Sequence, residues 1–328
     1  MANQKLKRSV KMSDITTNIF THCNSGLELA ANILKKGGLL AFPTETVYGL
    51  GADATNDIAV ARIYEAKGRP SFNPLIVHFA DISSVKTHVI WPKTAQLLAT
   101  AFWPGALTFV LEKRPESPIS RLTTAGLPNV AVRVPAHPVA ESLLRIFGGP
   151  VAAPSANLSG AISPTCSEHV KSGLLGSIEG IIDGGQCGLG LESTIVDLTD
   201  QPKLLRPGSV TAEAIENVLS IELAVAGSED GIKAPGQLIS HYAPKSLVRL
   251  DATKKLNGEV LLGFGNMTCD LNLSPTRDLT EAAANLFAFL HQLDTGTYKK
   301  IAVANIPKSG VGYAINDRLK RAAAPRDE

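Results

Sequence analysis

The sequence of 328 residues has only four cysteines and no long apolar run. The cysteines are scattered and form no CxxC pair, which favours reduced thiols in a cytoplasmic protein over a disulfide framework or a zinc site. No apolar run approaches the roughly 20 residues that a membrane-spanning helix needs, so no membrane partner is expected. The N-terminus is basic and polar without an apolar centre, and we expect residues 1–23 to be a flexible segment rather than a signal peptide.

A charge excess and the common phosphate and metal motifs are also missing. Lys and Arg number 32 against 30 Asp and Glu, so a net charge of +2 creates no overall field that would attract nucleic acid. The sequence contains neither GxxxxGK[ST] nor HExxH, which excludes a P-loop enzyme and a zinc protease site of that type. Gly49-x-Gly51-x-x-Ala54 matches a loosened dinucleotide fingerprint, but the acidic residue expected about 20 positions later is absent.

The segment 42–51, FPTETVYGLG, concentrates polar side chains directly after a short apolar run. The apolar run 38–41 predicts a buried strand, and we expect residues 52–67 to form a helix. Because ligands of α/β proteins commonly bind at loops that follow strands, Thr44 is a candidate site residue. An ordinary strand-to-helix connection is the alternative.

Two cations, Lys67 and Arg69, follow that helix and precede a proline-rich turn. The planar guanidinium of Arg69 suits a phosphate or a carboxylate, whereas Lys67 could equally be a solvated helix end near the negative pole of the helix dipole. His78 lies within the apolar strand 75–79, where a core histidine is the simplest interpretation.

Arg133 lies among valines in the predicted strand 129–135. A buried arginine without a partner is very costly, so Arg133 must pair with either a protein carboxylate or a ligand anion. Further along the chain, strand ends carry Ser155, Ser193 and Arg206, groups that suit phosphate or ribose but also make plain turns.

These residues together suit an anionic nucleotide beside a small zwitterion. No Ser-His-Asp order and no nucleophile stand out, so we expect catalysis by positioning and charge neutralisation. Strands alternate with helices along the chain, which predicts an α/β protein, and glycines and prolines between 224 and 246 indicate a linker before a small second α/β domain.

Long motifs resemble the YrdC/Sua5 family. They are PTETVYGLG (43–51), KGRP (67–70), NPL (73–75), WPG (103–105), VRVP (132–135) and PSANLSG (154–160); SHYAP (240–244) and AINDRL (314–319) resemble the longer Sua5 form. The resemblance implies a YrdC-like twisted mixed sheet with helices around a concave cavity, and a small Rossmann-like C-terminal domain. It places the catalytic domain at 24–212, a helix and linker over the active site at 213–246, and the C-terminal domain at 247–328.

The resemblance implies L-threonylcarbamoyladenylate synthase activity, a nucleotidyltransferase reaction. L-Threonine, bicarbonate and ATP would give threonylcarbamoyl-AMP and pyrophosphate, for N6-threonylcarbamoyladenosine at position 37 of tRNAs that read ANN codons. A downstream threonylcarbamoyl transferase complex, and tRNA itself, are the expected macromolecular partners. The alternatives are a double-stranded RNA or tRNA-binding module and, from the glycine fingerprint, an NADP-dependent enzyme.

The resemblance also assigns roles to particular residues. The L-threonine site would comprise Thr44, His78, Arg133 and Ser193. The ATP site would comprise Lys67, Arg69, Asn73, Asn129, Ser155, Ser163, Arg206 and Tyr242. Lys67 and Arg69 would be the catalytic pair, and Tyr242 of the linker would close over the nucleotide. Mg²⁺ is expected with ATP, with no metal held by protein side chains and no organic cofactor.

Overall fold

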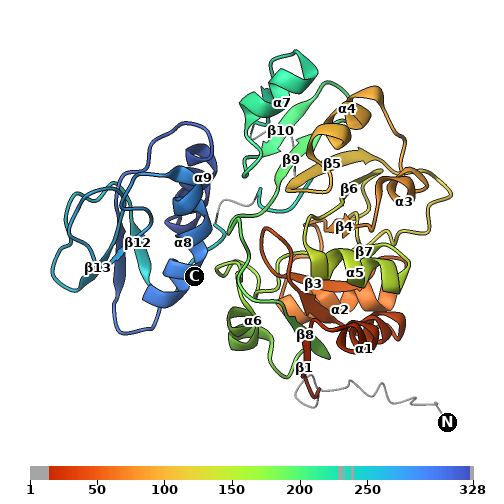
Figure 1. The fold of residues 1–328 in the computed structure, drawn as a ribbon, viewed down its shortest axis with the longest axis horizontal. Helices are drawn as coiled ribbons and strands as arrows, with labels where there is room; N and C mark the ends of the chain where they lie inside the picture. The colour runs from red at the N-terminus through yellow and green to blue at the C-terminus, as the bar shows by residue number, and fades with distance from the viewer. Residues whose placement is uncertain (1–14, 228–230, 232, 238–239, 326–328) are drawn as a thin grey trace, which may run out of the picture.

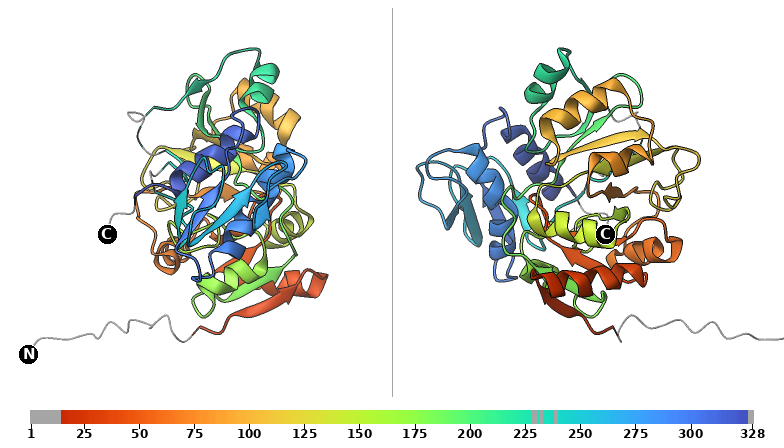
Figure 2. Two further views of the ribbon diagram at one scale, coloured as in Figure 1. Left: turned by 90° about the vertical axis from the view of Figure 1, so that its left-hand side faces the viewer. Right: turned by 45° about the vertical axis from the view of Figure 1, so that its right-hand side comes forward.

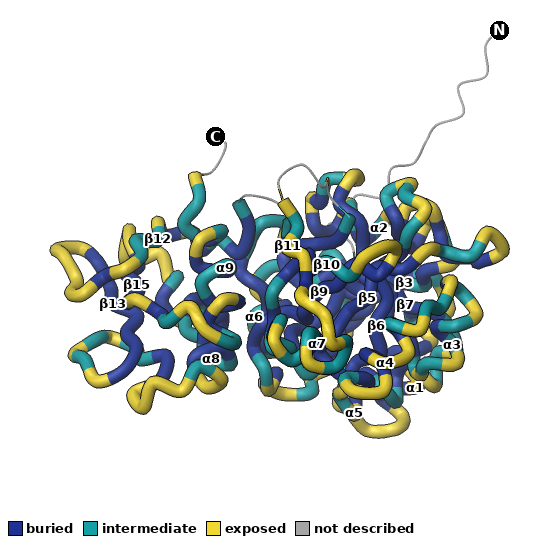
Figure 3. Tube along the Cα trace, turned by 90° about the horizontal axis from the view of Figure 1, so that it is seen from above, coloured by how far each residue is buried: buried dark blue, intermediate teal, exposed yellow. Residues whose placement is uncertain are grey.

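The computed structural model describes residues 15–227, 231, 233–237 and 240–325. It contains an eleven-stranded mixed sheet and a four-stranded parallel sheet, each with its own helices (Figure 1). Each sheet has its own buried apolar core, and the two cores lie side by side in Figure 3. The α/β class expected from the sequence is confirmed, whereas the predicted domain limits stay a prediction.

The large sheet orders its strands β1-β8-β2-β3-β7-β4-β6-β5-β9-β10-β11. The strands are β1 (Asn18–Thr21), β2 (Leu40–Phe42), β3 (Gly49–Asp53), β4 (Ile76–His78), β5 (Leu107–Glu112), β6 (Asn129–Arg133), β7 (Val151–Ala152), β8 (Gly180–Asp183), β9 (Thr194–Asp197), β10 (Lys203–Arg206) and β11 (Ala224–Val225). The helices around it are α1 (Asn24–Lys35), α2 (Asp57–Lys67), α3 (Ile82–Lys86), α4 (Lys93–Phe102), α5 (Pro138–Phe147), α6 (Ser167–Leu174) and α7 (Ala212–Leu219).

The strand register brings the polar positions of the sequence together. In β4 and β6, which run parallel, His78 pairs with Arg133, and in β5 and β9 Leu107 pairs with Thr194. The apolar residues between them are buried on both faces, as expected of central strands. Helices α1 and α5 pack side by side on the sheet around a second apolar cluster (Figure 2, right).

The four-stranded sheet has the order β12-β15-β13-β14, with all strands parallel. Its elements are β12 (Leu247–Arg249), β13 (Glu259–Gly263), β14 (Leu271–Asn272), β15 (Lys300–Val303), α8 (Leu279–Leu293) and α9 (Gly312–Ala322). Helices α8 and α9 lie on the side that faces the large domain (Figure 1). The contact is close, because a Cβ at Gly190 would lie 2.6 Å from the Cα of Ala284 in α8.

One expected helix is wrong in its first part. Residues 49–53 form β3, which pairs with β2 and β7, and helix α2 begins only at Asp57, where the Asn56 side chain accepts hydrogen bonds from two backbone amides. Gly49 and Gly51 therefore lie inside a strand, where Phe42 and neighbouring side chains leave little room for a Cβ. They do not form the strand-to-helix turn of a dinucleotide site, so the NADP interpretation is wrong.

None of the helices in the described ranges combines the length and the apolar character required to cross a membrane.

Candidate functional site

A small cavity of about 40 Å³ lies where the polar strand ends meet the linker. Segments far apart in the sequence form its wall. They contribute Thr44, Thr46, Val47, Gly49, Arg69, Ile76, His78, Arg133, Ala153, Pro154, Ser155, Glu192, Ser193, Arg206, Pro235, Gly236, His241 and Tyr242. The cavity is thus built by tertiary contacts between hydroxyl, imidazole and guanidinium groups.

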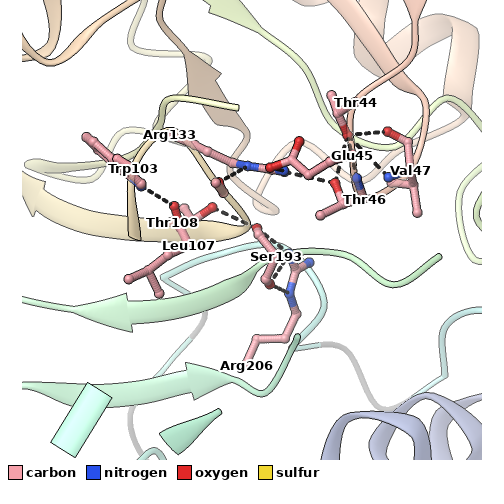
Figure 4. Close-up of polar contacts among 11 residues, drawn as sticks. Thr44, Glu45, Thr46, Val47, Trp103, Leu107, Thr108, Arg133, Ser193 and Arg206 are labelled. Atoms are coloured by element: carbon pink, nitrogen blue, oxygen red, sulfur yellow. Dashed lines mark hydrogen bonds and ion pairs between the residues drawn. The ribbon is translucent and has the colours of Figure 1, made fainter. Parts of the chain in front are cut away.

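The Thr44 hydroxyl organises the loop between β2 and β3. It donates to the Val47 carbonyl at 2.6 Å, accepts from the Val47 amide at 3.2 Å and lies 2.8 Å from the Thr46 hydroxyl (Figure 4). These bonds satisfy the polar groups of a buried turn, and they explain why hydroxyl residues occupy it. The ordinary-connection alternative is therefore partly right for the loop, although Thr44 and Thr46 also line the cavity.

Arg133 pairs with a protein carboxylate. Its Nη2 atom lies 2.7 Å from Glu45 Oε1, Nη1 donates to the Thr46 hydroxyl at 3.0 Å, and Nε donates to the Gly105 carbonyl at 3.1 Å (Figure 4). The sequence left open whether Arg133 pairs with a protein carboxylate or with a ligand anion, and in the structure it pairs with the carboxylate of Glu45. Glu45 was missed as a site residue, although it lies in the motif that drew attention to Thr44.

Ser193 joins two sides of the cavity. Its hydroxyl lies 2.7 Å from the Thr108 hydroxyl and accepts from Arg206 Nη2 at 3.2 Å (Figure 4). The Arg206 guanidinium also donates to the Ser193 carbonyl at 2.9 and 3.1 Å. Arg206 thus fixes the start of β9 and presents its guanidinium at the wall.

His78 is buried in the wall, and its Nδ1 atom has no protein partner among the described residues. Burial, and next the charge of Arg133, lower the pKa of His78 to about 3, so the ring is neutral at pH 7. Buried polar atoms in proteins are almost always hydrogen-bonded, and an unpaired one in a cavity wall indicates a ligand. His78 is therefore both part of the core and a candidate contact.

The buried neutral His78 makes the fold sensitive to acid. Its folded pKa is below the ordinary value of 6.5, so its contribution is full above that pH and is lost as the pH falls towards about 3. Between pH 7 and pH 4.5, the parent should lose about 3 kcal/mol more unfolding free energy than His78→Gln does. Denaturant titration at the two pH values would measure this difference. The exposed His22→Gln is the control, and an equal acid loss in both variants would contradict the assignment.

Three buried cations around the cavity have only neutral partners. Lys67, 2% exposed, donates from Nζ to the Ser155 carbonyl at 2.6 Å and to the Asn157 carbonyl. Arg69 donates to the Asn73 side chain at 2.7 Å and to the carbonyls of Asn73 and Pro74. Within the described ranges, no carboxylate lies at ion-pair distance from Lys67, Arg69 or Arg206. Lys67 is not the solvated helix end that the sequence allowed.

Burial of these cations without counter-ions lowers their pKa values. Burial is the largest cause for each, and it takes the pKa of Lys67 well below its usual range and that of Arg69 to about 10. The charge of Arg69 further lowers the pKa of Lys67, and Arg318 further lowers that of Arg206. Buried cations without counter-ions are costly, so this arrangement favours a bound polyanion.

Glu192 carries the contact between the two domains at the cavity. Its carboxylate accepts from Arg318 Nε in α9 at 2.9 Å and from the Ser163 hydroxyl. Arg318 is 1% exposed, pairs with Asp317 at 2.7 Å and lies over the Tyr242 ring at 5.2 Å. The sequence reasoning missed Glu192 and Arg318, although Arg318 lies within the AINDRL motif.

The linker closes the cavity. Tyr242 is buried with φ at 62°, stacks on Phe287 at 5.5 Å and leaves its hydroxyl without a partner in the described residues. Gly236, with φ at 85°, packs so closely that an added Cβ would lie 2.8 Å from the Tyr242 hydroxyl. A cavity of about 40 Å³ is far smaller than the roughly 300–1,000 Å³ of pockets that hold ligands of this size. A nucleotide therefore requires the linker to move.

Most of the predicted site residues converge. Eight line the cavity: Thr44, Arg69, His78, Arg133, Ser155, Ser193, Arg206 and Tyr242. Lys67, Asn73 and Ser163 lie directly behind it, each hydrogen-bonded to a wall residue. Asn129 does not line the cavity. It is the first residue of β6, pairs with Glu112 and lies about 13 Å along the strand from Arg133.

Family models match nearly the whole chain. A model for the Sua5, YciO and YrdC proteins, described as "Telomere recombination", matches residues 32–208. A second, described as "Threonylcarbamoyl-AMP synthase, C-terminal domain", matches residues 210–324.

Curated relatives are similar over almost their full length. The threonylcarbamoyl-AMP synthase of Bacillus subtilis is 42% identical, with 95% of this chain and 97% of that protein covered. The threonylcarbamoyl-AMP synthase of Pyrococcus abyssi is 42% identical, with 92% and 94% covered. The crystal structure of P. abyssi Sua5 complexed with L-threonine superposes with a TM-score of 0.87 at 38% identity, covering 94% of this chain and 98% of that one.

Proposed function

The chain belongs to the Sua5/YrdC family, in its long Sua5 form, and from this membership we infer how its cavity makes threonylcarbamoyl-AMP. It is a threonylcarbamoyl-AMP synthase, a nucleotidyltransferase that acts in the modification of tRNA. We infer that its substrates are L-threonine, bicarbonate and ATP, and that pyrophosphate is the second product. The modified nucleoside would be N6-threonylcarbamoyladenosine, made with a downstream transferase.

The observation that carries the nucleotide assignment is the group of three buried cations with neutral partners. Lys67, Arg69 and Arg206 approach the cavity from α2, the following turn and β10. A triphosphate would supply the counter-charge that the described residues do not. We propose that these residues hold ATP together with Asn73, Ser155, Ser163 and Tyr242. Asn129 would join them only if an adenosine extended far along β6.

The opposite end of the cavity suits an amino acid. P. abyssi Sua5 was crystallised with L-threonine, and we propose that threonine binds here between Thr44, His78, Arg133 and Ser193. The guanidinium of Arg133 suits the α-carboxylate, which would share it with Glu45 or replace Glu45. The unpaired Nδ1 of the neutral His78 offers a hydrogen bond to the substrate.

The reaction then follows as two bond-forming steps. The threonine amine attacks the carbon of carbon dioxide or bicarbonate, loses a proton and forms a carbamate, with water leaving in the bicarbonate case. A carbamate oxygen attacks the α-phosphorus of ATP, and the bond to the pyrophosphate oxygen breaks. Lys67 and Arg69 would neutralise the charge that develops on the triphosphate, while the wall holds both reactants in contact.

Mg²⁺ is expected to accompany ATP, and the site is compatible with a metal held by phosphate oxygens. Within the described residues no three His, Cys, Asp or Glu side chains form a metal-binding group, and Glu192 is the one carboxylate of the described wall. Bound in this way, Mg²⁺ would neutralise phosphate charge beside Lys67 and Arg69.

The decisive experiment measures pyrophosphate released from ATP, with and without threonine and bicarbonate. We expect release to need both co-substrates and threonylcarbamoyl-AMP to appear in equal amount. An RNA-binding module, the alternative from the sequence, would release no pyrophosphate in this assay. Pyrophosphate release that does not depend on threonine would contradict the proposal.

The closed linker predicts protection of the labile product. Tyr242→Ala removes the ring that packs on Phe287 and Arg318, and loss of a buried aromatic ring weakens the closed form by about 3 kcal/mol. We expect severalfold more ATP to be hydrolysed for each product molecule, because water enters the site. Tyr242→Phe, which keeps the ring, is the matched control. An unchanged ratio of ATP consumed to product in Tyr242→Ala would count against the lid.

A further inference from the structure

Two histidines from different domains stack on each other beside the nucleotide side of the cavity. His169 lies in the first turn of α6, and His291 lies near the end of α8. Their ring centroids are 3.8 Å apart and the ring planes differ by 17°. Both rings are partly buried where the two domains meet. The reaction outlined above uses neither ring.

Both rings hold the same short segment, residues 163–165. His291 Nε2 lies 3.1 Å from the Ser163 carbonyl, and the Thr165 amide donates to His169 Nδ1 at 3.3 Å. A carbonyl only accepts, so the His291 hydrogen is on Nε2; an amide donates, so His169 Nδ1 carries no hydrogen. The partners thus assign His169 as a neutral ring that accepts at Nδ1, and His291 as a ring that donates from Nε2.

The clamped segment leads directly to the cavity wall. The Ser163 hydroxyl donates to Glu192, which lines the cavity. The Pro164 carbonyl accepts from the Tyr48 amide at 2.8 Å, which ties the segment to the end of the loop that carries Thr44. A shift of residues 163–165 would therefore move wall groups on two sides.

We propose that His169 and His291 are positioning residues that together hold residues 163–165 at the nucleotide site, and that protonation of the pair releases the segment and weakens ATP binding. The proposal rests on the proposed role of Ser163 in binding ATP. It gives the C-terminal domain a direct part in the geometry of the site, because His291 belongs to that domain.

The surrounding charges set the direction of the pH response. Glu168 on α6, Asp294 at the end of α8 and Lys245 on the linker lie around the pair in a groove of about 630 Å³. Burial, and next His291, lower the pKa of His169 to about 4, while Glu168 opposes this. Burial also lowers the pKa of His291, against the opposing effects of the Ser163 carbonyl and Asp294.

These directions place the response on the acid side of neutrality. Both rings have pKa values below the ordinary 6.5, so the neutral stack is complete above that pH and is lost as the pH falls. A proton on His169 Nδ1 would face the Thr165 amide, donor against donor, and the ring would exchange that bond for one to the Thr165 hydroxyl, 3.3 Å away. A second proton on His291 would place two like charges in stacked rings.

Three full-length variants test the clamp. His291→Ala removes the donor to the Ser163 carbonyl. The double variant His169→Asn/His291→Gln keeps an acceptor and a donor at the same places but does not titrate. His88→Gln is the matched control, because His88 is also partly buried and hydrogen-bonded, 3.0 Å from the Ser117 hydroxyl in another part of the fold.

The first readout is hydrogen exchange at pH 7.5 in the peptide 160–168 without nucleotide, and the second is the Kd for ATP at pH 7.5 and 4.5. We expect His291→Ala to exchange faster and to raise Kd about 10-fold, as loss of a partner to a buried group does. Between pH 7.5 and 4.5, Kd should rise about fivefold more in the parent than in the double variant, and His88→Gln should follow the parent.

Unchanged exchange in His291→Ala would overturn the clamp whatever the ATP result. Faster exchange with an unchanged Kd would overturn the positioning role, and so would equal pH dependence in the parent and the double variant. Failure of the proposed function would be seen separately, as absence of threonine-dependent pyrophosphate release in the parent enzyme.

Discussion

Turnover of ATP to pyrophosphate is expected to fall about 10²–10³-fold when Arg69 is replaced by alanine, because one preorganised charge contact to the reacting group is lost. Arg69 lines the cavity and is held by the Asn73 and Pro74 carbonyls rather than by a counter-ion. Its charge is therefore available to the triphosphate. If the contact strengthens in the transition state, kcat falls together with kcat/KM.

Lys67→Ala should lower turnover to a similar extent, for a partly different reason. Lys67 Nζ also joins the carbonyls of Ser155 and Asn157, so its loss frees the loop after β7 as well as removing a charge. We therefore expect KM for ATP to rise more in Lys67→Ala than in Arg69→Ala. Steady-state kinetics with ATP as the varied substrate would separate the two effects.

The matched control is Arg62→Ala. Arg62 is on the same helix as Lys67, is about one-quarter exposed and pairs with Glu179 at 2.5 Å, away from the cavity wall. Thermal unfolding of each variant verifies that it is folded. Turnover within about threefold of the parent in both Arg69→Ala and Lys67→Ala would remove these residues from the catalytic assignment.

Arg318→Ala should produce the largest loss of stability, about 3–5 kcal/mol in the free energy of unfolding. Arg318 is fully buried and neutralises Glu192, which is buried too. Removing the arginine leaves an unpaired carboxylate inside the protein. The cation over the Tyr242 ring is lost as well, so the linker should close less well.

Arg318 also depresses the pKa of Glu192, against the opposing effect of burial. In Arg318→Ala, burial then acts with less opposition and the Glu192 pKa rises, so part of the stability should return at low pH, where the carboxylate is protonated. Denaturant titration at pH 7 and pH 5 would measure this. The deficit relative to the parent should be smaller at pH 5.

Two further variants make this prediction specific. Glu192→Gln/Arg318→Met removes both charges, and it should be more stable than Arg318→Ala because no buried charge is left alone. Arg145→Ala breaks the exposed pair with Glu141 and should cost less than about 1 kcal/mol. A deficit in Arg318→Ala no greater than that in Arg145→Ala would show that the buried pair contributes little.

Local features of the fold were predictable because their causes lie within a few residues. Thr211 caps α7 by accepting from the Ala214 amide, a hydrogen bond that joins residues only three positions apart. The buried strand expected from the apolar run 38–41 is present as β2. The helix expected at 52–67 begins only at Asp57, because residues 49–53 pair with β2 and β7 and this pairing overrides the weak local preference of the segment.

The roles of single residues in the site were harder to predict from the sequence. Periodicity favoured a core role for His78, and only the family resemblance suggested a ligand contact. The partner of Arg133 was left open between a protein carboxylate and a ligand, and Glu45 occupies that place in the structure. Lys67 is buried because the loop after β7 folds over it, which no neighbour in the sequence reveals.

The sequence alone determined the α/β class and, through its long motifs, the family and its reaction, because these depend on composition, short-range spacing and residue identity. The tertiary structure decided which charges are paired and which are not. Arg318 meets Glu192 across 126 positions of the chain, and Lys67, Arg69 and Arg206 are left with neutral partners. Burial and charge pairing depend on which distant segments pack together, and no local window of the chain contains that information.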